Sequence, residues 1–216
     1  MDRGNYLERL TAVCLVQRSY GALERALHRD FTVSELVALL DDRRAGVRGA
    51  AALALGAIGD YAVAPPLAQR LHDQDVMVRL VAEQSLWAIW LRSGDQAIDN
   101  LMREAAALLQ RGMRREAIQV LTTVIEQRPD FPEGYNQRAI AHYLNQDPAL
   151  ALADCEKAIA LNPIHFGAWA GMGHCYLHLR NREKALEAYE RALEINPNME
   201  QIRLIVQQLR GTINQS

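Results

Sequence analysis

The side chains best suited to metal chemistry gather at His174, Cys175 and His178. On a helix the two histidines would lie one turn apart, a spacing that a zinc ion could exploit. No HExxH or CxxC motif and no second group of ligands accompanies them, and Cys175 falls off the face that the histidines share. We therefore predict that the chain holds no metal and no cofactor, and that Cys175 packs in the core.

Catalytic chemistry finds little support in the remaining residues. Cys14, Cys155 and Cys175 carry no local signature of a nucleophile. A phosphate-binding loop of the form GxxxxGK[ST] is absent, and Gly171 and Gly173 fall within a helical segment. The carboxylates are spread over helical surfaces, so no two of them can be assigned as an acid and a base. We predict that the protein is not an enzyme.

The composition narrows the classes of partner. Lys and Arg number 24 against 26 Asp and Glu, with no basic stripe, so we expect no nucleic-acid partner. The uncharged stretch 158–179 contains Asn162-Pro163, so we expect no membrane-spanning helix and no membrane partner. Three cysteines at unrelated spacings, and no signal peptide, indicate a cytoplasmic protein.

A period of 34 residues organises the C-terminal half and must position these side chains. Pro129, Pro163 and Pro197 mark it. Other residue types recur in the same register: small residues at Ala105, Ala139 and Gly173, alanines at Ala117, Ala151 and Ala185, and larger residues at Leu121, Cys155 and Tyr189. Such a period is typical of a solenoid, in which each helix pair buries its apolar face against its neighbours.

Residues 98–198 resemble three tetratricopeptide repeats. The resemblance rests on Trp169, Gly173, Tyr176, Ala185, Tyr189, Ala192 and Pro197. It implies an all-α fold, a right-handed αα superhelix of helix–turn–helix repeats in which small residues let paired helices approach closely. The second repeat departs most from the pattern, with His142 in place of the tyrosine and Pro148 at the turn. Asp130 with Glu133 predicts a capped start for the next helix.

A second period, of 31 residues, occupies the N-terminal half. Leu36, Leu40, Val47, Arg48, Ala51, Leu55 and Ile58 recur as Leu67, Leu71, Val78, Arg79, Ala82, Leu86 and Ile89. These units resemble HEAT-like repeats of the short subtype found in bilin lyase subunits. Thr32 with Glu35 predicts a capping box before the first unit, and Gly59 predicts the end of its second helix. We interpret the Asp and Arg residues as caps and ion pairs between units.

The two periods predict the organisation of the whole chain. The segments are N-terminal capping helices over 1–31, two HEAT-like repeats over 32–94, three tetratricopeptide repeats over 95–198, and a C-terminal capping helix and tail over 199–216. The last helix is predicted from Met199 to about Arg210, with Gly211 as its stop. We expect Trp87 and Trp90 to pack the two arrays into a single continuous superhelix.

In the tetratricopeptide architecture the first helix of each unit lines a concave groove. By this resemblance the groove residues are Met102, Arg103, Glu133, Asn136, Gln137, Ile140, Tyr143, Leu144, Gly167, Ala170, Gly171, His174, Leu177 and His178. Gly167, Ala170 and Gly171 leave one wall without side chains, which predicts a shallow pocket bordered by Asn136, Ile140, Tyr143 and His174. We expect Gly171→Trp to abolish partner capture without lowering the melting temperature.

The best-known use of this groove is a carboxylate clamp that grips acidic chaperone tails with Lys, Asn and Arg. The matching positions are Met102, Ala106, Gln137, Gly167 and Gly171, and none of them is a cation. We therefore expect a different ligand. The predicted function is that of a scaffold or adaptor that binds a peptide or protein segment in the concave groove, on a rigid surface that needs little ordering.

Two other functions stay open. The HEAT-like half could make the protein an accessory subunit of an enzyme complex, similar to a chromophore lyase, and a tetrapyrrole titration read by absorbance separates this alternative from the adaptor. Self-association is the third hypothesis, with the terminal helix of one molecule in the groove of another. Concentration-dependent sedimentation would reveal it.

Overall fold

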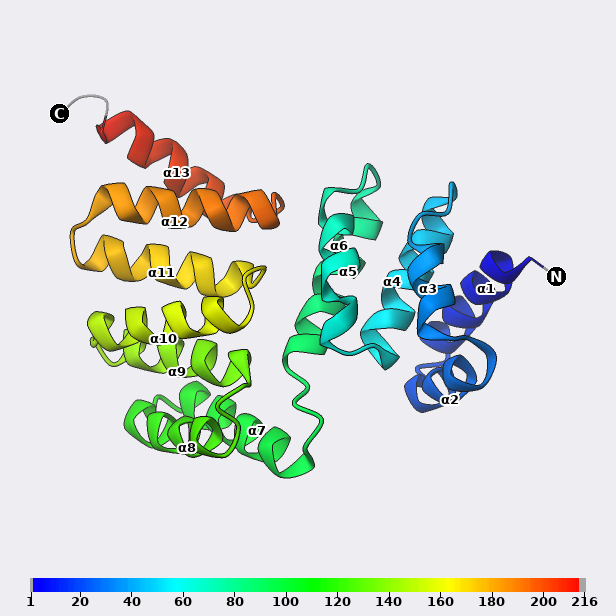
Figure 1. Cartoon of the computed structure of the whole chain (residues 1–216), viewed down its shortest axis with the longest axis horizontal. Helices are drawn as coiled ribbons and strands as arrows, with labels where there is room; N and C mark the ends of the chain where they lie inside the picture. The colour runs from blue at the N-terminus through cyan, green and yellow to red at the C-terminus, as the bar shows by residue number, and fades with distance from the viewer. Residues whose placement is uncertain (1, 214–216) are drawn as a thin grey trace. The chain divides into compact units, whose positions relative to one another are not determined.

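The computed structural model describes residues 2–213, and within this range the regular elements are all helices. The chain divides into two compact units, Met1–Trp90 and Leu91–Ser216. Figure 1 shows the helices of each unit stacked in chain order. The predicted all-α solenoid of helix–turn–helix repeats is confirmed.

The first unit begins and ends its helices at local signals that the sequence carries. Its elements are α1 (Arg3–Val16), α2 (Tyr20–Asp30), α3 (Val33–Leu39), α4 (Ala45–Ile58), the 3-10 turn η1 (Tyr61–Val63), α5 (Ala64–Gln69), the 3-10 turn η2 (Arg70–His72) and α6 (Val76–Trp90). The capping box before α3 is confirmed: the Glu35 N–H donates to Thr32 Oγ1 at 3.2 Å, and the Thr32 N–H donates to Glu35 Oε2 at 2.8 Å. The predicted end of α4 at Gly59 is also confirmed, and a Cβ there would lie 2.5 Å from the Leu55 carbonyl oxygen.

An ion pair joins the two HEAT-like units. Arg48 donates from Nε and Nη2 to the Asp73 carboxylate at 2.8 and 2.7 Å, and the Asp73 side chain is only 4% exposed. Arg48 Nη1 also donates to the Asp42 carbonyl oxygen at 2.9 Å. One unit later, Arg79 Nη1 donates to the Asp73 carbonyl oxygen at 2.9 Å. The structural interpretation of these Asp and Arg residues is therefore confirmed.

The second unit shows the 34-residue period in its backbone. Its helices are α7 (Gln96–Gln110), α8 (Arg114–Gln127), α9 (Pro132–Leu144), α10 (Pro148–Leu161), α11 (Phe166–His178), α12 (Arg182–Ile195) and α13 (Glu200–Ile213). The turn inside each helix pair contains one left-handed residue, Gly112 (φ 74°), Gln146 (φ 68°) or Arg180 (φ 59°). The N–H of the following residue then donates to the carbonyl oxygen five residues earlier, at 2.9, 3.0 and 2.9 Å.

The second repeat, whose sequence departs most from the pattern, keeps the same turn as its neighbours. The hydrogen bond that closes a helix with a left-handed residue is present in all three repeats. Pro148 stands at the first turn of α10, where its missing N–H is not needed and its fixed φ suits a helix. The turn geometry of the second repeat is therefore the same as in its neighbours.

Close contact between paired helices depends on the small residues, as predicted. A Cβ on Gly173 of α11 would lie 2.5 Å from Cδ1 of Tyr189 on α12, and Tyr189 is 0% exposed. Ala139 and Ala151 are buried at the matching positions of the preceding repeat. The glycine is required because the tyrosine ring occupies the space that a side chain would need.

Two predicted helix boundaries are wrong. The N-cap of α9 is Phe131 and has no side-chain cap, because Asp130 accepts from Arg128 Nε at 3.0 Å while Glu133 is fully buried. Helix α13 does not stop at Gly211 but continues to Ile213, because Gly211 does not adopt a positive φ. The predicted tail over 214–216 lies outside the described residues.

The amphipathic face of the terminal helix is confirmed. Ile202, Val206 and Leu209 are buried together with Ala185 and Tyr189 of α12. They cover the apolar side of the last repeat, which would otherwise face water, as expected of a capping helix at the open end of a solenoid.

Trp90 closes the first unit. Its ring is 0% exposed and meets the Trp87 ring edge-on at 5.4 Å between centroids, and its carbonyl oxygen accepts a hydrogen bond from Tyr61 at 3.0 Å. That Trp87 and Trp90 join the two arrays into one continuous superhelix stays a prediction, as do the four segment boundaries.

The packing of α11 on α12 makes a stability prediction. Gly173→Ala should lower the free energy of unfolding by about 1–3 kcal/mol, because the new methyl group forces the Tyr189 ring or a helix to move. Gly211→Ala is the matched control: it has nothing within 4 Å and lies in a helix, where alanine is favoured over glycine. Urea unfolding measures both. A Gly173→Ala protein as stable as the control would contradict this packing.

The Arg48–Asp73 pair makes a pH prediction. The hydrogen bond from Arg48 lowers the pKa of Asp73, so its stabilising contribution is present above the unfolded pKa of about 4 and is lost as the pH falls through the folded pKa. Asp73→Asn should cost about 3 kcal/mol at pH 7, because it leaves the Arg48 cation unpaired, and clearly less at low pH.

The control for this measurement is Asp41→Asn. Asp41 also faces an arginine, Arg70 at 3.2 Å, but its side chain is 78% exposed, so its pair should contribute less than about 1 kcal/mol. Equal losses for the two variants at pH 7, or a loss for Asp73→Asn that does not shrink in acid, would contradict the assignment.

Candidate functional site

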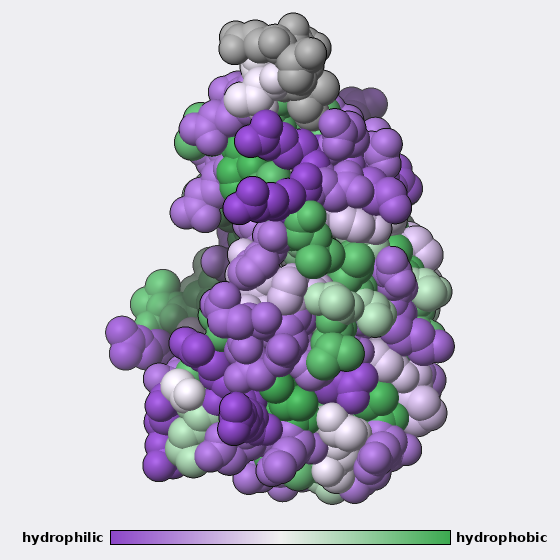
Figure 2. All heavy atoms as spheres, turned by 90° about the vertical axis from the view of Figure 1, so that its left-hand side faces the viewer, coloured by the Kyte–Doolittle hydropathy of each residue, from purple (hydrophilic) through white to green (hydrophobic). Residues whose placement is uncertain are grey.

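The candidate site is identified by a pocket. Exposed apolar residues alone do not identify it. On the face that Figure 2 shows, hydrophilic residues predominate and hydrophobic residues form separate patches. Single exposed apolar residues are normal on protein surfaces. In the second unit, however, α9, α10 and α11 enclose a hollow of about 220 Å³.

Uncharged side chains line this hollow, which we call the groove pocket. Its lining consists of Asn136, Ala139, Ile140, Tyr143, Leu144, Cys155, Gly167, Gly171, His174 and Cys175. The four predicted border residues, Asn136, Ile140, Tyr143 and His174, are all among them. The structure thus brings together the central residues of the predicted groove; that a partner binds there stays a prediction.

Gly171 and two cysteines form the floor of the groove pocket. A Cβ on Gly171 would lie 3.2 Å from Cys155 Sγ, so the glycine leaves the sulfur at the surface of the hollow. Cys155 and Cys175 are each 1% exposed, which confirms that Cys175 packs in the core. A hydrogen bond with Cys175, together with burial, raises the pKa of the Cys155 thiol. A protonated, buried thiol is a poor nucleophile.

Aromatic rings form one side of the groove pocket. The Tyr143 ring lies 6.2 Å from the His174 ring and 5.8 Å from the His178 ring, between centroids. Tyr189 Oη and His174 Nδ1 share a hydrogen bond of 2.7 Å. Burial lowers the pKa of His174, so this imidazole is neutral at pH 7. The rim therefore offers apolar and aromatic surface without a formal charge.

Glu133 lies behind the groove pocket, not on its surface. Its carboxylate is 0% exposed. It accepts hydrogen bonds from His165 Nε2 at 2.8 Å, from Gln137 Nε2 at 2.6 Å, and from Asn136 Nδ2 at 3.2 and 3.3 Å. The prediction that Glu133 lines the groove is wrong in this respect. Its carboxylate is needed inside, where it accepts hydrogen bonds from the two amides.

The sequence reasoning missed His165, which completes this network. His165 is 0% exposed and precedes α11, where its Nδ1 accepts a hydrogen bond from the Ala168 N–H at 3.1 Å. It therefore caps α11 and contacts Glu133 of α9 at the same time. A histidine at an N-cap is a weak local signal, and its partner is 32 residues away in the chain.

The outer members of the predicted groove are more dispersed. Met102 and Ala170 are buried at 7% and 6% exposure, and Leu177 packs against the core of the last repeat. Arg103 is exposed and donates to Asn100 on its own helix. His178 is exposed, and its ring meets the Tyr143 ring.

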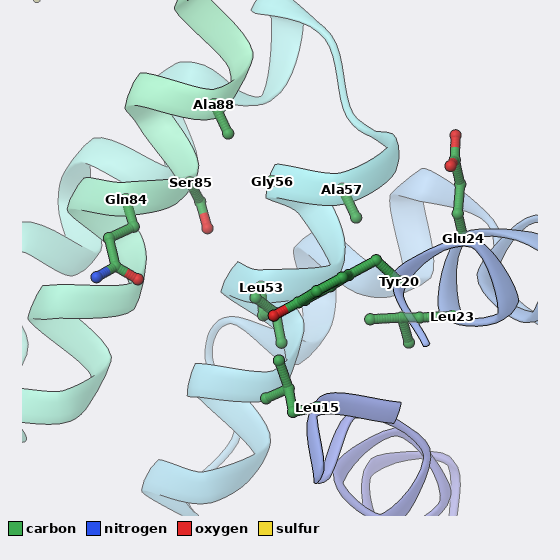
Figure 3. Close-up of a pocket in the computed structure, with 10 residues that line it drawn as sticks. All are labelled: Leu15, Tyr20, Leu23, Glu24, Leu53, Gly56, Ala57, Gln84, Ser85 and Ala88. Atoms are coloured by element: carbon green, nitrogen blue, oxygen red, sulfur yellow. The ribbon is translucent and has the colours of Figure 1, made fainter. Parts of the chain in front are cut away.

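A larger hollow in the first unit was not predicted. It measures about 370 Å³ and lies among α1, α2, α4 and α6. Its lining consists of Leu15, Tyr20, Leu23, Glu24, Leu53, Gly56, Ala57, Gln84, Ser85 and Ala88. Figure 3 shows the Tyr20 side chain reaching from α2 toward Leu53 on α4. The available signal was the apolar character of Leu15 and Tyr20, which are 42% and 64% exposed.

Metal-ligating side chains do not converge in the part of the chain that the structure describes. No group of three or more His, Cys, Asp or Glu residues there could hold a metal ion. His174 Nδ1 already bonds Tyr189 Oη. Among the same residues, no helix is long and apolar enough to span a membrane.

Models of two repeat families match the chain. A model described as HEAT repeats matches residues 17–87. Models described as tetratricopeptide repeats match residues 132–165 and 167–199. These ranges agree with the two periods and with the division into two units.

Curated relatives match part of the chain. A TPR repeat-containing protein of Rhizobium etli is 29% identical over 126 residues, which is 56% of this chain and 62% of the relative. The human protein SGT1 homolog is 38% identical over 73 residues, which is 34% of this chain and 20% of that protein. The chain thus spans less than two thirds of the length of these relatives.

Solved structures resemble the fold. The first TPR of Spaghetti (RPAP3), bound to the HSP90 peptide SRMEEVD, has a TM-score of 0.54 and 27% identity, over 55% of this chain and 94% of that one. MamA has a TM-score of 0.52 and 18% identity, over 65% of this chain and 86% of that one. The second likeness concerns the fold alone.

The Glu133–His165 contact predicts a specific loss of stability. His165→Ala removes the cap of α11 and one donor from a buried carboxylate, so it should lower the free energy of unfolding by about 2–4 kcal/mol. His178→Ala, at an exposed position on the same helix, should change it by less than about 0.5 kcal/mol. Chemical denaturation followed by circular dichroism measures both. Similar values for the two variants would contradict the network.

Proposed function

Because the chain is a tetratricopeptide-repeat protein with HEAT-like repeats in its N-terminal half, we propose that it acts as an adaptor that binds a peptide or protein segment in the groove pocket. The residues that would contact the segment are Asn136, Ile140, Tyr143, Leu144, Gly167, Gly171 and His174. In this role the chain needs no catalytic group and no cofactor.

The observation that carries this proposal is the groove pocket itself. A hollow of about 220 Å³ with an apolar lining suits one bulky side chain of a partner. Its walls come from three helices that pack on one another, so the surface is already formed before binding. Little conformational entropy is then lost on association, and a modest interface is enough for a specific contact.

The comparison with solved structures supports the same role. The first TPR of RPAP3 holds an HSP90 peptide, and its likeness extends over 55% of this chain. A groove on this fold is thus able to hold an extended segment. The side chains decide which segment binds.

The predicted clamp positions favour a ligand other than an acidic tail. Gly167 and Gly171 carry no side chain, Met102 is buried, and Gln137 points its amide nitrogen at Glu133. An acidic segment would need a cation in the groove pocket to attract it, and no Lys or Arg lines this pocket. Apolar contact is therefore the main attractive term.

The alternative function, an accessory subunit of an enzyme complex, would use the pocket of the first unit. A partner or ligand of the HEAT-like half would find there about 370 Å³ of mainly apolar space. The role of an accessory subunit for an enzyme complex would use this surface and leave the groove pocket unused. Variants of the groove pocket therefore separate the two functions.

The test blocks the groove pocket without disturbing the core. Gly171→Trp is unsuitable, because a Cβ at this position already lies 3.2 Å from Cys155 Sγ and the indole would lower the melting temperature. Ile140→Arg places a charged side chain at the rim from a position that is 41% exposed. Leu150→Arg, 54% exposed on α10 and outside the lining, is the matched control.

The measurement is selection from a displayed library of short random peptides. Wild-type protein and Leu150→Arg should enrich the same peptides, and Ile140→Arg should bind them at least about tenfold more weakly. Thermal melting shows that the three proteins are equally folded. Peptides that bind all three equally would place the interaction outside the groove pocket.

A further inference from the structure

Two of the three cysteines of the chain belong to the lining of the groove pocket. Cys155 on α10 and Cys175 on α11 both border the hollow, and they share one buried cluster with Met172. Each of them is 1% exposed, and each is a free thiol. The adaptor function proposed above uses them only as lining, so it leaves the chemistry of the two thiols without a role.

The packing of α10 on α11 brings the two thiols together. A Cβ on Gly171 would lie 3.2 Å from Cys155 Sγ, so Cys155 reaches α11 at the position of this glycine. Cys175 follows Gly171 on the same helix and lies about one turn further along the same face. A hydrogen bond then joins the Cys155 and Cys175 side chains directly. The two thiols form a close pair that connects two helices.

The two thiols of this pair differ in acidity. The hydrogen bond with Cys175, together with burial, raises the pKa of Cys155, and the same hydrogen bond lowers the pKa of Cys175. Cys155 therefore keeps its proton and donates it to the Cys175 sulfur. Because the thiolate is the form of cysteine that reacts with peroxides, Cys175 is the nucleophile of the pair. Cys155 is the neighbouring thiol that can react with the first oxidation product.

The groove pocket gives a small oxidant a route to the pair. Both cysteines border the hollow of about 220 Å³, and Gly171 places no side chain beside the Cys155 sulfur. Hydrogen peroxide is scarcely larger than water, and a polar molecule of that size needs only a small part of such a volume. Cys14 differs from the pair, because it is the single cysteine of the first unit.

We propose that Cys155 and Cys175 are a redox modification site, which forms a reversible disulfide between α10 and α11 when hydrogen peroxide enters the groove pocket. The disulfide itself is independent of the proposed function, and its effect on binding rests on that function. An S–S bond of about 2.0 Å is much shorter than the contact between two thiols. Closing it draws two closely packed helices together and changes the shape of the hollow, so the oxidised protein should bind its segment more weakly.

The reaction consumes one molecule of peroxide. The Cys175 thiolate attacks one peroxide oxygen: an S–O bond forms, the O–O bond breaks, and the leaving hydroxide takes the proton of Cys155 to become water. The Cys155 thiolate then attacks the Cys175 sulfur: an S–S bond forms, the S–O bond breaks, and hydroxide leaves. The two sulfurs together lose the two electrons that the peroxide gains. A dithiol such as dithiothreitol returns them and restores both thiols.

Mass spectrometry of the full chain tests the site. The reduced protein is treated with a small excess of hydrogen peroxide, unfolded, blocked with N-ethylmaleimide and cut with trypsin. Cleavage after Lys157 separates the two cysteines, so the disulfide should join the fragments 139–157 and 158–180 within one chain, and dithiothreitol should release them. Cys14 should carry N-ethylmaleimide. If the pair stays reduced, or if Cys14 is oxidised as fast as the pair, the inference is wrong.

Two matched variants test the roles of the two thiols. In Cys155→Ser the hydroxyl keeps a hydrogen-bond donor but cannot form a disulfide, so peroxide should leave a sulfenic acid on Cys175 that dimedone traps. Cys175→Ser makes the same change on the other helix and should leave Cys155 unlabelled at the same dose. Equal labelling of the two variants would contradict the assignment of Cys175 as the nucleophile. If either variant does not fold, the cross-link in the wild-type protein decides alone.

Peptide binding tests the consequence for the groove pocket. The dissociation constant of the most enriched peptide should rise several-fold on oxidation and return with dithiothreitol, whereas peroxide should not change it for Cys175→Ser. A complete disulfide with an unchanged constant would overturn the control of binding. Selection that Ile140→Arg does not affect would overturn the proposed function, but the cross-link is measured without peptide and would stand. The two failures are therefore distinguishable.

Discussion

A buried carboxylate needs hydrogen-bond donors, and in this protein that need organises the candidate site. Glu133 of α9 is fully buried and cannot reach water, so His165, Asn136 and Gln137 supply its hydrogen bonds. His165 also caps α11, so the same contact connects the first helix of the second repeat to the first helix of the third.

The packing of the helices around this network depends on small residues that stand opposite large ones in the repeats. Gly173 lets the Tyr189 ring approach α11, and Gly171 leaves room beside the buried Cys155 sulfur in the lining of the groove pocket. Each helix pair is closed by one left-handed residue, and this residue need not be glycine: Gln146 and Arg180 occupy it in the second and third repeats. The Schellman-type hydrogen bond outweighs the small strain of a left-handed conformation there.

The periodic features could be predicted from the sequence, because they depend on residues at fixed spacing: the two repeat types, the Thr32 capping box and the border of the groove pocket. The network around Glu133 could not. Asp130 and Glu133 have the spacing of a capping box, but Asp130 accepts a hydrogen bond from Arg128. Glu133 contacts His165, which lies in the next repeat. The hollow of the first unit was missed because Leu15 and Tyr20 look like ordinary core residues of a capping helix until their exposure is known. Local patterns predict local structure, whereas these features depend on residues that are distant in the chain.

The central claim is that the His165 ring donates from Nε2 to Glu133 and accepts at Nδ1 from Ala168, and nitrogen NMR of the selectively labelled ring tests it most directly. At neutral pH the structure predicts a protonated Nε2, an unprotonated Nδ1 and a ring proton that exchanges slowly with water, because both nitrogens are hydrogen-bonded and buried. A proton on Nδ1, or a ring proton that exchanges as fast as that of the exposed His178, would contradict the account.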